Sequence, residues 1–185
     1  MSAPTCHANA VVVGAAGVLI RGPSGAGKSA LARRLVDTAT AEGGFASLVA
    51  DDRVVLAACN GRLVARVPAA IAGLAELRCR GIVALPHEPA AVVRLVVDIL
   101  GEGAAERLPE PAALMTEILG VTLPRQPVPP DLDHAAALVF AALADHDDVT
   151  RRSNFACAAD EPVQMWAARR PADPPRRADG RREDE

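Results

Sequence analysis

Apolar residues in this chain form short runs, and the spacing within them changes between strand-like and helix-like along the first half. The runs typical of buried strands cover residues 10–13, 17–21, 45–50, 82–85 and 91–100. Helical spacing covers residues 29–41, 69–79, 112–119 and 134–144. Asn60-Gly61 separates two further apolar runs and predicts a hairpin with a type I′ turn. Strands that alternate with helices predict an α/β fold with a sheet that is at least partly parallel.

The pattern also predicts two parts, a folded domain over residues 1–145 and a tail over residues 146–185. From Thr150 onward the chain has eight Arg and seven acidic residues without sustained apolar periodicity, which is typical of disorder. For residues 162–170 (PVQMWAARR), the alternative is a short helix that docks Met165 and Trp166 on a partner.

Composition narrows the class of protein. Half of the 185 residues are apolar, which excludes a wholly disordered chain, and no apolar run is long enough to span a bilayer. The near balance of 20 basic and 23 acidic residues argues against a nucleic-acid binder with a broad basic face. The first residues lack a secretory signal pattern, and the four cysteines lack zinc-binding spacing. We therefore expect a cytoplasmic protein with reduced thiols, and neither nucleic acid nor membrane as partner.

The strongest motif is a phosphate-binding loop. The segment GPSGAGKS fits the P-loop pattern G-x-x-x-x-G-K-[ST] and lies between a predicted strand and a predicted helix. The residues expected to bind ATP are Gly22, Pro23, Ser24, Gly25, Ala26, Gly27, Lys28 and Ser29. Lys28 is the single lysine among the 20 basic residues, at a position where a compact charge reaches the β- and γ-phosphates. The Ser29 hydroxyl is the expected Mg²⁺ ligand, and the fold expected is an α/β P-loop nucleotide-binding core, with a mixed sheet flanked by helices and added β-hairpins.

A P-loop predicts phosphate binding but not the reaction, so the nearby carboxylates matter. Asp51 and Asp52 follow the apolar run after the P-loop helix. In an α/β sheet the C-terminal end of a neighbouring strand lies beside the bound phosphates. A carboxylate there can hold Mg²⁺ or accept a proton from a hydroxyl nucleophile. The alternative is an ordinary Asp turn at the end of a strand.

Further motifs follow the same order as in a known family. His7 precedes the P-loop, LVADDRV covers residues 48–54, AELRCRGI covers residues 75–82, and ERL covers residues 106–108. With these motifs, the chain from His7 to about Leu143 resembles the catalytic domain of bacterial HPr kinase/phosphorylase, in a short form without the amino-terminal domain. The resemblance implies ATP-dependent phosphorylation of a serine on the phosphocarrier protein HPr, which regulates a bacterial phosphotransferase system. It also implies phosphorolysis or hydrolysis of that phosphoserine, a Mg²⁺ cofactor and a homo-hexamer.

The same resemblance assigns roles to individual residues. Asp51 would be the catalytic base, and Lys28 with the Gly22–Ser29 backbone would hold ATP. Ser29 and Glu76 would bind Mg²⁺, with Asp52 as a further candidate ligand. His7 and Arg107 would contact phosphates near the reacting centre. The signature segment contains Glu76, Arg78, Arg80 and Gly81. Without the resemblance, His7, Glu76 and the arginines are ordinary surface residues, with Arg107 in a surface ion pair.

This chain departs from the family pattern at several positions. Pro23 and Ala30 stand where the family commonly has acidic residues, and extra residues lie around 38–44. The family stretch associated with dephosphorylation is present only as PVPPDLDH at residues 127–134, without its Gly, Arg and Asn. Asp131 and Asp133 in that segment would repel a phosphate. We therefore expect kinase activity to be retained and phosphorylase activity to be weak, lost or differently regulated.

Two other functions fit the motifs. One is a small-molecule kinase on a P-loop core, in which residues 101–111 would form an Arg-bearing lid. The other is a regulatory module that binds ATP without transferring phosphate. A GTPase is disfavoured because its Asn-Lys-x-Asp motif needs a second lysine.

Overall fold

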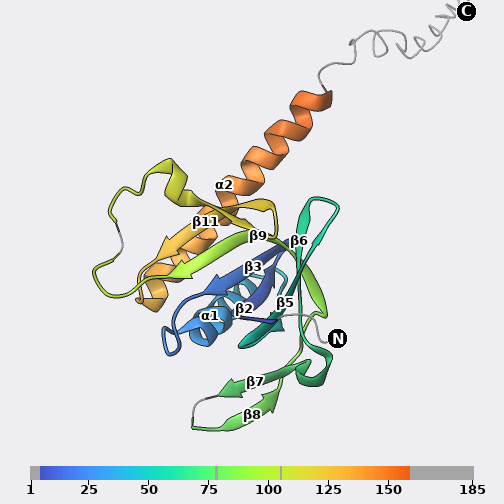
Figure 1. Ribbon diagram of the computed structural model, residues 1–185, viewed down its shortest axis with the longest axis vertical. Helices are drawn as coiled ribbons and strands as arrows, with labels where there is room; N and C mark the ends of the chain where they lie inside the picture. The colour runs from blue at the N-terminus through green and yellow to red at the C-terminus, as the bar shows by residue number, and fades with distance from the viewer. Residues whose placement is uncertain (1–4, 78, 105, 159–185) are drawn as a thin grey trace, which may run out of the picture. The chain divides into compact units, whose positions relative to one another are not determined.

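A computed structural model describes residues 5–158 of the chain, except residues 78 and 105 (Figure 1). A nine-stranded mixed sheet forms the main layer, with the path β1-β5-β6-β9-β3-β2-β4. Its strands are β1 (Thr5–His7), β2 (Asn9–Val13), β3 (Ala16–Arg21), β4 (Ala46–Ala50), β5 (Arg53–Cys59), β6 (Arg62–Arg66), β9 (Ala90–Ile99), β10 (Met115–Ile118) and β11 (Val121–Val128). A separate hairpin consists of β7 (Leu74–Leu77) and β8 (Gly81–Ala84). The helices are α1 (Lys28–Ala41), α2 (Leu132–Ala158) and two short 3₁₀ turns, η1 (Ala69–Ile71) and η2 (Pro111–Leu114).

The centre of the sheet is parallel and its flanks are antiparallel. β9 runs parallel to β3 along one edge and parallel to β11 at its C-terminal end. β6 pairs with the N-terminal end of β9, and β2 pairs with both β3 and β4, all antiparallel. The predicted α/β fold with a partly parallel sheet is therefore confirmed.

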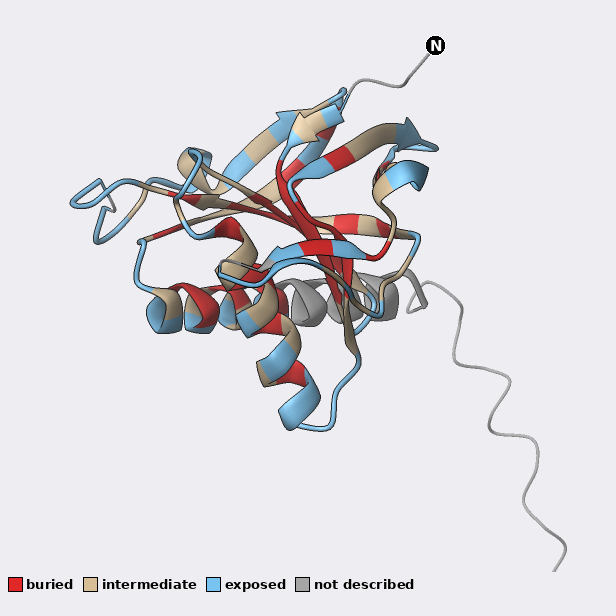
Figure 2. Cartoon of the chain, turned by 90° about the horizontal axis from the view of Figure 1, so that it is seen from below, coloured by how far each residue is buried: buried red, intermediate tan, exposed pale blue. Residues whose placement is uncertain are grey.

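Alternating side chains on the central strands pack into two cores. On β3, Val18 and Ile20 belong to the cluster beneath the helices, whereas Leu19 belongs to the cluster on the other face. This alternation follows from the two-residue period of a strand. Leu35 of α1 and Val139 of α2 pack into the first cluster, so both helices cover the same face. Figure 2 shows the buried residues gathered on the central strands and on the sides of the helices that face them.

Most of the elements predicted from local pattern are confirmed. The strands expected at residues 10–13, 17–21, 45–50, 82–85 and 91–100 match β2, β3, β4, β8 and β9 within a few residues. The helix expected at residues 29–41 is α1, and the helix at residues 134–144 lies within α2. Asn60 and Gly61 both have positive φ (49° and 70°) between β5 and β6, as a type I′ turn requires.

Two predicted helices are wrong. Residues 69–79 form η1 and then β7, because Gly73 (φ +71°) ends the turn and the following residues pair with β8. Residues 112–119 form the end of η2 and then β10, which pairs with β11 across a turn at Leu119-Gly120. In both segments apolar residues at helical spacing lie on short hairpin strands, and cross-strand pairing overrides the local pattern.

Helix α2 crosses the predicted boundary at residue 145 and ends at Ala158, so residues 150–158 are helical. The residues described up to Asp147 form one compact unit. The segment of residues 162–170 lies outside the described residues. Within the described part of the chain, neither helix combines the length and the apolar character that a membrane span requires.

Candidate active site

The P-loop occupies the turn between the end of β3 and the start of α1. Gly27 caps α1 in the left-handed region (φ 94°), and its carbonyl accepts the first helical hydrogen bond from Leu31 at 2.8 Å. A side chain at Gly27 would be strained in this conformation. The loop therefore presents the N-terminal end of α1, with its unpaired N–H groups and positive partial charge, to a bound phosphate.

Lys28 is held inside this loop. Its side chain is 6% exposed, and Nζ donates hydrogen bonds to the carbonyl oxygens of Gly22 (3.1 Å) and Pro23 (3.0 Å). A buried ammonium needs such partners. These contacts place a fixed positive charge against the loop at the position where the motif predicts contact with the β- and γ-phosphates.

Asp51 lies beside the P-loop and is linked to it by a residue that sequence reasoning missed. The Asn9 side chain is fully buried, and its Nδ2 donates hydrogen bonds both to Ser29 Oγ (3.1 Å) and to Asp51 Oδ1. The other carboxylate oxygen of Asp51 accepts the backbone N–H of Glu76 at 3.1 Å. Asp51 is 8% exposed. One amide therefore orients both the expected Mg²⁺ ligand and the expected base.

Asn9 had a signal in the sequence, because it is the polar residue at the start of the apolar run NAVVV. A buried polar side chain inside a strand pattern needs hydrogen-bond partners, and Asn9 finds them in the site. Its Oδ1 is buried and has no hydrogen-bond partner among the described residues. Rotating the amide by half a turn would bring Oδ1 against the Asp51 carboxylate, so the observed orientation is the favourable one.

Asp52 points away from this buried pair. It has a left-handed backbone (φ 65°) in the turn between β4 and β5, and the N–H of Arg53 donates a hydrogen bond to the Asp51 carbonyl at 2.8 Å. Its Oδ1 lies 2.7 Å from Nε2 of His7, and both side chains are largely exposed. The tight turn after β4 thus separates the two carboxylates, with Asp51 inside the site and Asp52 at its rim.

Most of the predicted site residues surround one cavity of about 450 Å³. α1 and the P-loop form one wall, the end of β4 forms another, and β1 and β7 contribute single residues. The lining residues are His7, Ser24, Gly25, Gly27, Lys28, Ser29, Ala30, Arg33, Asp51, Asp52 and Glu76. The fold therefore brings together residues of the P-loop, both aspartates, His7 and Glu76.

Arg107, Arg80 and Gly81 do not line this cavity. Arg107 lines a different cavity of about 560 Å³, together with Arg125, Gln126 and His134. Arg80 is exposed in the turn of the β7–β8 hairpin, and Gly81 begins β8 with φ 94°. Arg78 lies outside the described residues.

The acidic residues of segment 127–134 have structural contacts at the start of α2. Asp131 Oδ1 accepts the backbone N–H of His134 at 2.8 Å, which is an N-terminal cap. Asp133 forms an ion pair with Arg34 of α1. Asp131 therefore caps α2, and Asp133 links α2 to α1. Neither residue lines the phosphate cavity.

A partly buried ion network supports the P-loop near the C-terminal ends of the parallel strands. Asp98 of β9 accepts two hydrogen bonds from Arg21, at 2.7 and 2.8 Å, and a third from Arg125. Burial raises the pKa of the Asp98 carboxyl, but the hydrogen bonds from the two guanidinium groups outweigh it and hold that pKa below its usual value. Because Arg21 directly precedes Gly22, this network fixes the strand end from which the P-loop starts.

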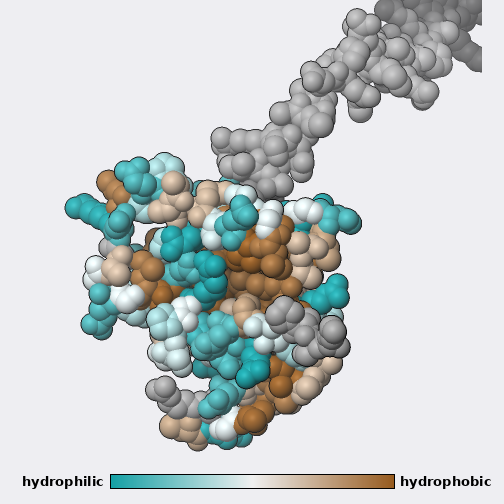
Figure 3. Space-filling model, viewed as in Figure 1, coloured by the Kyte–Doolittle hydropathy of each residue, from teal (hydrophilic) through white to brown (hydrophobic). Residues whose placement is uncertain are grey.

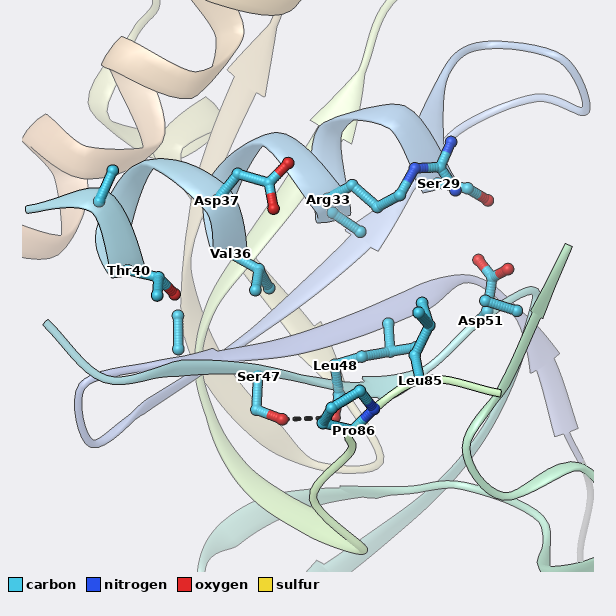
Figure 4. A pocket seen from close by; sticks show the side chains of 14 residues that line it. Ser29, Arg33, Val36, Asp37, Thr40, Ser47, Leu48, Asp51, Leu85 and Pro86 are labelled. Carbon is cyan, nitrogen blue, oxygen red and sulfur yellow. Dashed lines mark hydrogen bonds between the residues drawn. The ribbon is translucent and has the colours of Figure 1, made fainter. Parts of the chain in front are cut away.

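A second, mainly apolar cavity of about 550 Å³ opens beside the phosphate cavity (Figure 4). Val36 of α1, Leu48 of β4, Leu85 and Pro86 form its apolar walls. Ser29, Arg33 and Asp51 line both cavities. The two spaces therefore meet at the residues that carry the expected chemistry.

Comparisons with known proteins bear on the family and the fold of the chain. The family profile described as HPr Serine kinase C-terminal domain matches residues 2–156. The solved structure of the HPr(Ser) kinase/phosphatase from Coxiella burnetii is similar to this chain, with a TM-score of 0.69 and 24% sequence identity. That match covers 86% of this chain and 99% of the other, and at this identity it shows the fold. A search of curated protein sequences finds no match.

Proposed function

This chain belongs to the family of HPr serine kinase C-terminal domains, and from this premise we propose that it transfers the terminal phosphate of ATP to a serine of an HPr-type phosphocarrier protein. The observation that carries the proposal is the shared cavity of Lys28, Ser29 and Asp51, in which the Asn9 amide bonds to both Ser29 and Asp51. Phosphoryl transfer to a hydroxyl requires a group that binds the phosphates and a base that borders the same cavity.

ATP would bind with its triphosphate in the P-loop. The backbone N–H groups at the start of α1 would donate to the β-phosphate, and the Lys28 ammonium would exchange a carbonyl partner for a phosphate oxygen. Both groups are already fixed by the fold, so little ordering is needed when the nucleotide binds.

The donor set fits Mg²⁺. The Ser29 hydroxyl and the carboxylates of Glu76 and Asp52 line the cavity, and oxygen ligands are those that Mg²⁺ prefers. Among the described residues no group of three or more His, Cys, Asp or Glu side chains is arranged to hold a metal. Mg²⁺ commonly uses one or two side chains together with phosphate oxygens and water, which agrees with that observation. When bound, the ion would neutralise charge on the phosphates.

Asp51 would accept the serine proton. Its two oxygens are oriented by Asn9 and by the N–H of Glu76, and each oxygen retains a lone pair for the substrate hydroxyl. As the serine oxygen bonds to the γ-phosphorus, the bond from that phosphorus to the β–γ bridging oxygen breaks and ADP leaves. His7, which pairs with Asp52 at the rim, would contact phosphates near the reacting centre.

We propose that the reverse reaction is weak. The segment of residues 127–134 places Asp131 and Asp133 at the start of α2, where they cap the helix and pair with Arg34. Arg107 lines another cavity, so it does not add a cation to the phosphate cavity in this structure. Incubation of phosphoserine-HPr with inorganic phosphate tests the proposal, and rapid release of HPr would contradict it.

The apolar cavity supports a second candidate, a kinase for a small molecule. A space of about 550 Å³ next to Asp51 is large enough for a small organic acceptor. A module that binds ATP without transfer is the remaining alternative. The acceptor experiment separates the HPr kinase from both alternatives: the chain is incubated with ATP, Mg²⁺ and purified HPr-like carrier, and intact masses are measured.

The proposal predicts one added phosphate on the carrier and none on a carrier whose acceptor serine is replaced by alanine. Absence of transfer to any HPr-type carrier would contradict it and favour the two alternatives. The proposal also includes a cytoplasmic setting and a homo-oligomer, as the family resemblance implies. Figure 3 shows hydrophobic surface between hydrophilic patches on one face of the chain, and light scattering of the purified protein would measure its assembly.

A further inference from the structure

Arg33 stands on the boundary between the two cavities of the site. It lies on α1 one helical turn after Ser29 and lines both the phosphate cavity and the apolar cavity. Side chains on a helix lean toward its N-terminus, and Figure 4 shows the guanidinium of Arg33 directed back toward Ser29. Arg33 therefore lines both cavities, with its charged end on the side of Ser29 and the P-loop.

The charge of Arg33 is not used elsewhere in the described structure. Of the side chains that line the phosphate cavity, Lys28 and Arg33 carry permanent positive charge, beside the three carboxylates of Asp51, Asp52 and Glu76. No ion pair among the described residues involves Arg33. Its neighbour Arg34, in contrast, pairs with Asp133.

We infer that Arg33 binds the terminal phosphate of the nucleotide and is a further substrate-contacting residue of this site. The inference rests on the proposed function, since it requires a triphosphate in the P-loop. Arg33 shares both cavities with Ser29 and Asp51, so its guanidinium lies on the side of the site where the phosphate faces the acceptor. A planar guanidinium can donate two parallel hydrogen bonds to phosphate oxygens, and it stabilises the charge that is shared between them during transfer.

Arg33 takes the phosphate-contacting role that the sequence motifs gave to another arginine. The resemblance gives the phosphate-contacting arginine as Arg107, which lines another cavity with Arg125 and His134. Arg33 instead projects from α1, a helix that packs on the core through Leu31 and Leu35. A residue on a rigid helix is held near its phosphate without closure of a loop.

The test compares the binding of ATP and ADP, each with Mg²⁺, by isothermal titration calorimetry. In Arg33→Gln the dissociation constant for ATP should rise by about tenfold, the usual effect of losing a hydrogen bond to a charged group. The constant for ADP should stay within about twofold, because ADP lacks the terminal phosphate. Arg33→Lys keeps the charge but lacks the two parallel N–H donors of a guanidinium. Its dissociation constant for ATP should lie between those of the unaltered protein and Arg33→Gln.

Arg34→Gln is the matched control, because it removes the same group one residue further along the same helix and outside both cavities. It should leave both nucleotide constants unchanged. Equal constants for Arg33→Gln and the unaltered protein, or equal weakening of ATP and ADP, would overturn the inference while leaving the ATP site intact. If the unaltered protein binds no ATP, the proposed function itself fails.

Discussion

The side-chain amide of Asn9 donates a hydrogen bond to the carboxylate of Asp51 across 42 positions of sequence. The same nitrogen also donates to the Ser29 hydroxyl at 3.1 Å. Asn9 is at the start of β2, which pairs antiparallel with both β3 and β4. β2 therefore ties the strand that leads into the P-loop to the strand that ends at Asp51.

Replacing Asn9 should affect the chemical step more than nucleotide binding. Asn9→Leu keeps a similar volume but removes the donor, so Asp51 and Ser29 lose their common partner. We expect kcat to fall roughly 10- to 100-fold, as small misplacements of catalytic groups do. The KM for ATP should change by less than about threefold, because the P-loop contacts remain.

Steady-state kinetics with HPr as acceptor measure both constants for the Asn9 variant. Thermal unfolding serves as the control for a folded protein, with an expected loss of about 1–3 kcal/mol for the unmet hydrogen bond of buried Asp51. A folded Asn9→Leu protein with unchanged kcat would show that the Asn9 amide does not position the base.

Arg should not replace Lys28. Lys28 is 6% exposed, and its ammonium bonds to two backbone carbonyls within the P-loop, a space that suits a compact charge and not a planar guanidinium. We expect Lys28→Arg to weaken ATP binding at least about tenfold, although the formal charge is unchanged. Calorimetry at constant ionic strength measures this effect, and ATP binding as tight as in the unaltered chain would contradict it.

The network at Asp98 should make stability depend on pH. The folded-state pKa of Asp98 is held below its ordinary value of 3.8, so the ionised carboxylate stabilises the fold above that value. This stabilisation is lost as the pH falls through the lower, folded-state pKa. We expect Asp98→Asn to reduce the free energy of unfolding by about 1–3 kcal/mol at neutral pH, with the difference shrinking below pH 3.8.

Urea unfolding of both proteins over a pH series provides the measurement for Asp98. Asp133→Asn is a suitable control, since it alters an exposed ion pair with Arg34, and such pairs contribute little. A stability difference for Asp98→Asn that persists undiminished into the acid range would contradict the assigned role.

The elements predicted correctly are those whose signals are local. The strands around the P-loop are continuous apolar runs, helix α1 has a clear apolar stripe, and Asn60-Gly61 fixes its own turn conformation. β7 and β10 are four-residue strands whose conformation depends on their partners in the hairpin. Apolar spacing alone does not distinguish such a strand from a helical turn, which explains both incorrect helices.

The candidate site was predictable where the chemistry resides in a motif. The P-loop, the Asp pair, His7 and Glu76 are brought to one cavity. Asn9 and Arg33 could not be assigned in the same way, because their importance comes from neighbours in space: Asn9 bridges two strands, and Arg33 borders two cavities. For Arg107 the opposite holds: it belongs to a sequence motif, but the motif did not determine which cavity it lines.

The most direct test of the central claim is the rate of phosphate transfer from ATP to HPr by Asp51→Asn, measured by intact mass at saturating ATP. This variant keeps the shape of the side chain but removes the proton acceptor. Our account predicts that transfer falls by about 10²- to 10⁴-fold, the usual contribution of a general base, while the dissociation constant for ATP stays within about threefold. Transfer by Asp51→Asn at a rate close to that of the unaltered protein would contradict the account.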